Sequence, residues 1–98
     1  MNYQEMIESD RRLVILKVLL DSAGYACNEH LLSALLGSFG HVVSIDRVRT
    51  DLSWLAEQGM IGVREVGGVQ IATATLRGLD VAQGRASVPG VKRPAPGA

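Results

Sequence analysis

The sequence predicts a mostly α-helical domain that carries a small β-hairpin, and residues 44–73 are the main reason. Residues 45–57 repeat apolar side chains at spacings of three and four, which is typical of an amphipathic helix. Two β-branched runs, 60–66 and 69–73, follow at once and are joined by Gly67-Gly68, a strong signal for a two-residue hairpin. A helix followed by such a hairpin is how a winged helix-turn-helix domain ends. We therefore expect that fold, with three helices, a wing sheet of two or three strands and a C-terminal helix.

Local signals mark both ends of the helix before the hairpin. Ser44 stands at the N-cap position, and Asp46 places a negative charge in the first turn, where the helix dipole favours it. Gly59 accepts the left-handed conformation expected just beyond the last turn. The apolar stripe comprises Ile45, Val48, Leu52 and Leu55. At about 100° per residue, the residues that point away from it are Asp46, Thr50, Ser53, Trp54 and Glu57, with Arg47 and Arg49 on the flanks.

The first helix carries two apolar stripes. Asn2 and Glu5 have capping-box spacing, so we expect a helix from there to about Ser22, stopped by Gly24. The core stripe is Leu13, Leu16 and Leu20, and the second stripe, nearly opposite and interrupted by Arg11, is Ile7, Val14 and Val18. A helix that is apolar on two faces is either sandwiched within its domain or shared with another subunit. The second stripe is therefore a candidate homodimer interface.

Caps and breakers place the remaining elements. Asn28 caps a short second helix that ends near Leu36, and Val42-Val43 could form a very short strand that pairs with the wing. Thr75 caps a last helix that runs to about Arg85. Beyond it lie all three prolines of the chain, a composition that does not build a helix or a sheet core. We expect a winged-helix domain over residues 2–86 and a flexible Pro/Gly-rich tail over residues 87–98.

Length and composition indicate one compact cytoplasmic domain. The chain has 98 residues, of which 47% are apolar and 20% charged. No apolar run reaches the roughly 18 residues that a membrane span needs, and no basic segment leads into an apolar one at the N-terminus. Cys27 is alone, so an internal disulfide is excluded and a reducing compartment is expected.

No pattern indicates catalysis, a cofactor or a metal site. Cys27, His30 and His41 are the only soft metal ligands, whereas tetrahedral zinc needs four, usually in two pairs. No Ser/His/Asp or Cys/His arrangement has a recognisable context. A strand rather than a helix follows Gly67-Gly68, so this pair is not a phosphate-binding loop. We expect a protein without enzymatic activity, cofactor or metal.

Four segments are distributed over nearly the whole chain: DRRLVILKVLL, VSIDRVRTDLSWLAEQGMI, the hairpin EVGGV and TLRGLDVAQGRASVPGVKRP. Through these segments the chain resembles a family of small proteins that Mu-like phages and prophages encode. Such proteins are usually described as winged-helix or ArsR-like. The resemblance implies a phage-derived bacterial protein with a DNA-binding type of fold, and the lone Cys27 favours the cytoplasm of the bacterial host. Paired cysteines or His/Asp clusters, which ArsR-type metal sensors carry, are missing here.

Two functions fit these observations. The first is binding of double-stranded DNA in transcriptional control, because the corresponding helix of helix-turn-helix domains enters the major groove. Its candidate contacts are Ser44, Arg47, Arg49 and Thr50 from the helix, Arg64 from the wing, and Lys92 and Arg93 from the tail. The second is a protein–protein module that serves phage assembly or another regulator and no longer binds DNA.

Charge and one aromatic residue bear on this choice. The net charge of zero favours the protein–protein module, because nucleic-acid-binding domains normally show a basic excess. The arginines that flank a capped helix favour DNA binding. Trp54 either packs against the wing strands or the first helix, or anchors an interface with a partner.

Overall fold

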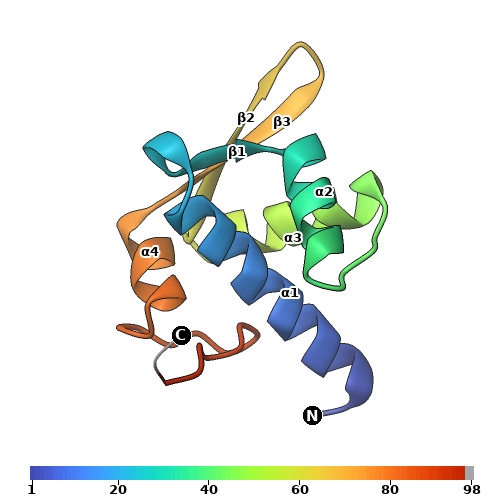
Figure 1. Ribbon diagram of the computed structural model, residues 1–98. Helices are drawn as coiled ribbons and strands as arrows, with labels where there is room; N and C mark the ends of the chain where they lie inside the picture. The colour runs from blue at the N-terminus through green and yellow to red at the C-terminus, as the bar shows by residue number, and fades with distance from the viewer. Residues whose placement is uncertain (97–98) are drawn as a thin grey trace.

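The computed structural model describes residues 1–96, in which four α-helices, a 3-10 turn and a three-stranded antiparallel sheet follow one another (Figure 1). The elements are α1 (Tyr3–Leu20), η1 (Ala23–Tyr25), β1 (Ala26–Asn28), α2 (Glu29–Ser38), α3 (Ile45–Glu57), β2 (Ile61–Val66), β3 (Val69–Ala74) and α4 (Leu76–Ala82). This order confirms the predicted fold class, a winged-helix-like domain with three helices, a hairpin and a C-terminal helix. Gly97 and Ala98, the end of the expected tail, lie outside the described residues.

Polar side chains start the helices at the positions that the sequence indicates. The Asn2 side chain accepts a hydrogen bond from the Glu5 N–H at 2.8 Å, which is the N-cap half of the predicted capping box, and its amide also donates to the Glu5 carboxylate at 3.3 Å. Asn28, Ser44 and Thr75 cap α2, α3 and α4 in the same way, each through the backbone N–H three residues on. Such caps satisfy N–H groups that have no partner inside the helix.

The sheet has the order β1-β3-β2, so the hairpin strand β3 lies in the middle. Gly67 and Gly68 form the hairpin tip with φ values of 57° and 80°, which residues other than glycine rarely adopt. The third strand is β1, whose Cys27 pairs with Ala72. The expected strand at Val42-Val43 is wrong, because these residues lie in an extended link before α3 and Val42 is largely exposed.

The core lies between α1, α2, α3 and the inner face of the sheet. Its fully buried aliphatic side chains are Ile15, Leu16, Leu19, Leu32, Leu36, Val48, Leu52, Leu55 and Met60. Helix α4 packs closely on this core at Gly78, because a Cβ added there would lie 2.1 Å from the Met60 carbonyl oxygen. The second stripe of α1, Ile7, Val14 and Val18, is half-buried rather than covered. The domain therefore leaves part of that face open.

The segment after α4 differs from the expected flexible tail. Helix α4 ends at Ala82 rather than near Arg85, and Gly84 turns the chain with a φ of 77°. Val88 and Val91 then enter the core with exposed fractions of 6% and 7%, and the Lys92 N–H donates to the Ser9 carbonyl oxygen. Figure 1 shows this segment beside the N-terminal half of α1. The expectation of a tail outside the domain is wrong for residues 88–92, because two valines three residues apart reach the core from a turn without any helical or strand periodicity.

Candidate nucleic-acid interface

Helix α3 presents one face to the core and the other to solvent. Ser44 Oγ accepts a hydrogen bond from the Arg47 N–H at 3.1 Å, which fixes the start of the helix. Val48, Leu52 and Leu55 are fully buried, and their spacing fixes which residues turn outward. The exposed residues of the outer face are Ser44, Asp46, Arg47, Thr50, Ser53 and Glu57. The structure thus brings Ser44, Arg47 and Thr50 together on the N-terminal half of α3.

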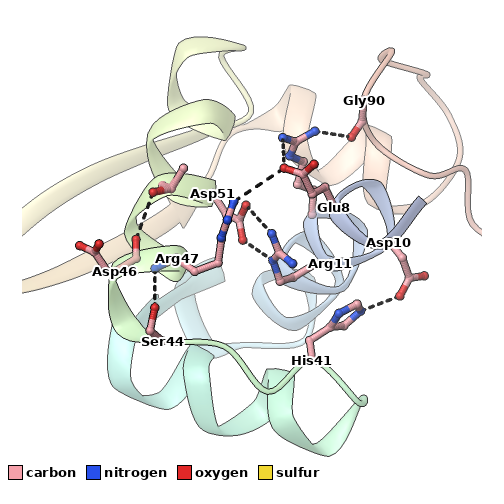
Figure 2. A network of polar contacts seen from close by, with 11 residues as sticks. Glu8, Asp10, Arg11, His41, Ser44, Asp46, Arg47, Asp51 and Gly90 are labelled. Carbon is pink, nitrogen blue, oxygen red and sulfur yellow. Dashed lines mark hydrogen bonds and ion pairs between the residues drawn. The ribbon is translucent and has the colours of Figure 1, made fainter. Parts of the chain in front are cut away.

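Arg47 keeps an accessible guanidinium group. Its side chain is 42% exposed, and the Nη1 atom lies 3.8 Å from Glu8 Oε2 of α1 (Figure 2). Glu8 is shared, because Arg12 Nη2 lies at the same distance from Oε2. Exposed ion pairs of this length contribute little to stability, so Arg47 is free to take another anionic partner.

The middle of the α3 outer face is a shallow hollow lined mostly by polar residues. Its volume is about 400 Å³, and it is lined by Asp46, Arg49, Thr50, Ser53, Trp54 and Glu57. The Thr50 hydroxyl group donates to the Asp46 carbonyl oxygen at 3.1 Å. The Thr50 Oγ1 atom can still accept a hydrogen bond from a ligand. Two carboxylates line this hollow, and they oppose an approaching phosphate.

Arg49 has a structural role that the sequence did not indicate. Its Nε donates to Glu29 Oε1 at 2.6 Å, and its Nη2 donates to Glu29 Oε2 at 2.9 Å and to the Gly68 carbonyl oxygen at 3.1 Å. One guanidinium group therefore joins α3 to the start of α2 and to the tip of the wing. The side chain is still 40% exposed, but its Nε and Nη2 groups are directed at the protein itself, so the geometry adds a structural role to the predicted contact of Arg49 with DNA, which stays a prediction.

Glu29 is the buried partner in this junction. Its side chain is inaccessible to solvent, and its Oε2 also accepts the Gln70 N–H of β3 at 2.6 Å. The hydrogen bonds from Arg49 and then from Gln70 lower the pKa of Glu29 to about 2, although burial acts in the opposite direction. A charged Glu29 thus fixes the wing to α2 and α3 across the physiological pH range.

The other three predicted contacts lie apart from this face. Arg64 is exposed, but its neighbour Val63 pairs with the buried Ala72, so strand alternation places Arg64 on the outer face of the sheet, away from the core. Lys92 and Arg93 line a groove at the N-terminal end of α1. That end of α1 points away from the wing (Figure 1). Lys92 Nζ donates to Asp10 Oδ1 at 3.3 Å. The seven candidate residues therefore do not form one surface.

A buried ion pair behind the outer face is the main feature that sequence analysis missed. Arg11 of α1 donates from Nε to Asp51 Oδ2 at 2.5 Å and from Nη2 to Oδ1 at 3.2 Å, and the two side chains are 3% and 1% exposed (Figure 2). Asp51 is thus neutralised inside the domain and does not face an incoming phosphate. The one signal in the sequence that pointed to this buried pair was the position of Arg11, a charged residue within an apolar stripe.

Trp54 is covered from two sides. The Arg12 guanidinium carbon lies 4.0 Å from the centre of the Trp54 ring, a cation–π contact, and Arg12 Nη1 donates to the Gly90 carbonyl oxygen at 3.0 Å. Gly90 lies directly on the ring, because a Cβ added there would come within 2.7 Å of Trp54 Cζ2. Trp54 therefore packs against the first helix, which is one of the arrangements that the sequence suggested. It also packs against the C-terminal segment, and this contact was not expected.

The polar residues considered as metal ligands are dispersed. Within residues 1–96, no three His, Cys, Asp or Glu side chains gather as a metal site would require. Cys27 is buried in β1, where burial raises the pKa of its thiol. His41 Nε2 lies 2.7 Å from Asp10 Oδ2. Burial raises the pKa of Asp10, but hydrogen bonds from His41 and Lys92 outweigh it and leave this pKa below its ordinary value.

None of the described helices is long and apolar enough to cross a membrane.

Comparisons with known proteins connect the chain to phages. It is 49% identical over 92 residues to the uncharacterized protein gp26 of Escherichia phage Mu, which covers 94% of this chain and 95% of gp26. It is 44% identical over 80 residues to an uncharacterized protein of Haemophilus influenzae, which covers 81% of this chain and 78% of the relative. No protein-family model matches the chain, and no solved structure matches it at a significant level. The two alignments span most of each protein, so the chain belongs to the family of Mu-like phage proteins that includes gp26 of phage Mu.

Proposed function

We propose that this protein binds double-stranded DNA through the N-terminal half of α3 and acts in phage or prophage transcriptional control in the cytoplasm of the bacterial host. The observation that carries the proposal is the uncovered outer face of α3, on which Arg47 and Thr50 are exposed beside the capped helix start at Ser44. A guanidinium group suits guanine edges and phosphates, and a hydroxyl group suits either. The free N–H groups and the dipole at a helix N-terminus add attraction for phosphate.

The charge distribution limits the strength of this binding. Asp46 and Glu57 lie on the same face as Arg47, and Glu8 lies 3.8 Å from its guanidinium group. Each phosphate contact gives a slope of about −0.9 in the logarithm of the binding constant against the logarithm of salt concentration. With few cations on α3, we expect weak binding with a shallow salt dependence. Arg49 would support this surface by holding the wing.

Fluorescence anisotropy with duplex DNA from the regulatory region of a Mu-like phage tests the proposal. Arg47→Ala should weaken binding by about 1–3 kcal/mol if the side chain reads a guanine edge. A smaller, sequence-independent loss with a shallower salt slope would indicate a phosphate contact. Arg85→Ala is the matched control, because Arg85 is also exposed but lies beyond α4. An Arg47→Ala variant that binds as well as the parent would rule out this role of α3.

A second function has its own supporting observation. An apolar groove at the N-terminal end of α1, which contains the exposed side chains of Tyr3 and Met6, suits contact with another protein. In this reading, the winged-helix-like domain serves phage assembly or another regulator. Chemical-shift mapping at low salt separates the two functions. Duplex DNA that perturbs only residues 87–96, or no residue at all, would favour the protein–protein function.

A further inference from the structure

The open face of α1 carries an apolar groove at its N-terminal end. The groove has a volume of about 560 Å³ and is lined by Met1, Tyr3, Met6, Ile7, Ser9, Asp10, His41 and residues 90–93. Met1, Tyr3 and Met6 are largely exposed, although they are large and apolar. Monomeric proteins seldom leave such a concave cluster in water without a binding role.

A projecting aromatic side chain stands at the other end of the same face. Phe39, in the link between α2 and α3, is 62% exposed. It borders a smaller hollow of about 230 Å³ that Val14, Lys17, Val18 and Asp21 of α1 also line. Aromatic side chains are among the most frequent anchors of protein interfaces, because they bury a large area with few rotatable bonds.

The groove and Phe39 share one side of α1. Ile7 lines the groove, whereas Val14 and Val18 line the hollow beside Phe39. At about 100° per residue, these three positions fall within roughly 40° of one another around the helix. At about 1.5 Å per residue, Ile7 and Val18 are separated by about 16 Å along the helix axis. An exposed aromatic side chain and an apolar groove thus lie along one helix face, about three turns apart.

We propose that two copies of this chain pair antiparallel through this face of α1, with Phe39 of each copy in the groove of the other. A two-fold axis near the middle of α1 exchanges the two ends of the face, so both Phe39–groove contacts form at once, as an isologous interface requires. The proposal does not depend on DNA binding, and its tests contain no DNA.

Charge complementarity selects a second copy as the occupant. Asp21 is exposed beside Phe39, in a hollow where Lys17 is only half-buried, whereas Arg93 is exposed at the groove, where Asp10 already contacts Lys92 and His41. The two-fold pairing brings Asp21 of one copy towards Arg93 of the other, which sets opposite charges against each other twice. Lys92 is already hydrogen-bonded to Asp10, so Arg93 is the cation that this contact uses.

Sedimentation equilibrium of the full chain tests the pairing. Phe39→Ser and Met6→Glu should each weaken self-association by at least about tenfold, which corresponds to about 1.4 kcal/mol. An equimolar mixture of these two variants should associate better than either alone, because the mixed pair keeps one of the two Phe39–groove contacts. Val42→Ser is the control, since Val42 is largely exposed in the same link but lines neither hollow.

Charge reversal adds a test that a folding defect cannot imitate. Asp21→Lys and Arg93→Glu should each weaken association, and the chain that carries both changes should regain it, because the reversed charges meet across the two-fold axis. Thermal unfolding of every variant checks that the domain remains folded. A parent protein that stays monomeric at its highest soluble concentration would overturn the proposal. So would a mixture or a doubly reversed variant that recovers no association, and a partner of another sequence would then be the occupant to seek.

Discussion

Replacing Asp51 with asparagine tests the buried ion pair that joins α1 to α3. The change keeps the size of the side chain but removes its charge, so Arg11 remains buried without a counter-ion. Both side chains are almost inaccessible, and the pair is bidentate, with distances of 2.5 and 3.2 Å. Asp51→Asn should therefore remove much of the stability of the domain, although it does not touch the outer face of α3.

The expected magnitude follows from burial. Removing one partner of a buried pair typically costs about 3–5 kcal/mol, whereas an exposed pair is worth about 0–1 kcal/mol. A domain of this size has a total stability of roughly 5–15 kcal/mol, and each kcal/mol shifts its Tm by about 4–8 °C. Asp51→Asn should accordingly lower the Tm by roughly 12–40 °C. Replacing both partners, as in Arg11→Met with Asp51→Leu, should be much less harmful, because no unpaired charge is left.

Urea and thermal unfolding, monitored by circular dichroism, give the required free energies. Glu57→Gln is the matched control, because Glu57 is exposed on the same helix and its loss should change the free energy of unfolding by no more than about 0.5 kcal/mol. The reasoning would be refuted if Asp51→Asn cost less than about 1 kcal/mol, the range of an exposed pair. Double replacement that costs as much as the two single changes added together would also refute it, since the two side chains would then be energetically independent.

Three further changes test other contacts. Gly78→Ala should lower the Tm markedly, because its Cβ would lie 2.1 Å from the Met60 carbonyl oxygen, whereas Gly37→Ala, with nothing within 4 Å, should be neutral or stabilising by up to about 1 kcal/mol. Gly90→Ala should detach the C-terminal segment from Trp54, because φ is 96° and the Cβ would lie 2.7 Å from the ring; a tryptophan emission maximum that does not shift to the red would contradict this. Glu29→Gln should lower the free energy of unfolding at neutral pH and make that free energy depend less on pH in the acid range. The folded pKa of Glu29 is about 2 against an ordinary 4.5, so its stabilisation is complete above pH 4.5 and is lost as the pH falls towards 2, which an acid titration followed by circular dichroism measures.

The local elements of this protein could be predicted from its sequence because their causes are local. A cap such as Ser44 acts on an N–H three residues away, and Gly67-Gly68 turns the chain through its own φ angles. The apolar spacing of α3 likewise fixes its buried face without reference to the rest of the chain. The helices, the hairpin and the exposure of Arg47 and Thr50 therefore followed from the sequence.

Contacts between distant segments were decided only by the tertiary structure. In the sequence, Arg49 has the pattern of a surface residue, but in the fold it bonds to Glu29, which stands 20 positions earlier. Arg11 likewise bonds to Asp51, which stands 40 positions later. The third strand and the burial of Val91 depend in the same way on which segment reaches an open sheet edge or a gap in the core. Periodicity shows which face of a helix is apolar, but it does not show which partner a charged side chain will find, because that depends on packing between elements. For this reason the sequence located the outer face of α3, whereas only the structure showed that Arg49 joins this helix to Glu29 and to the tip of the wing.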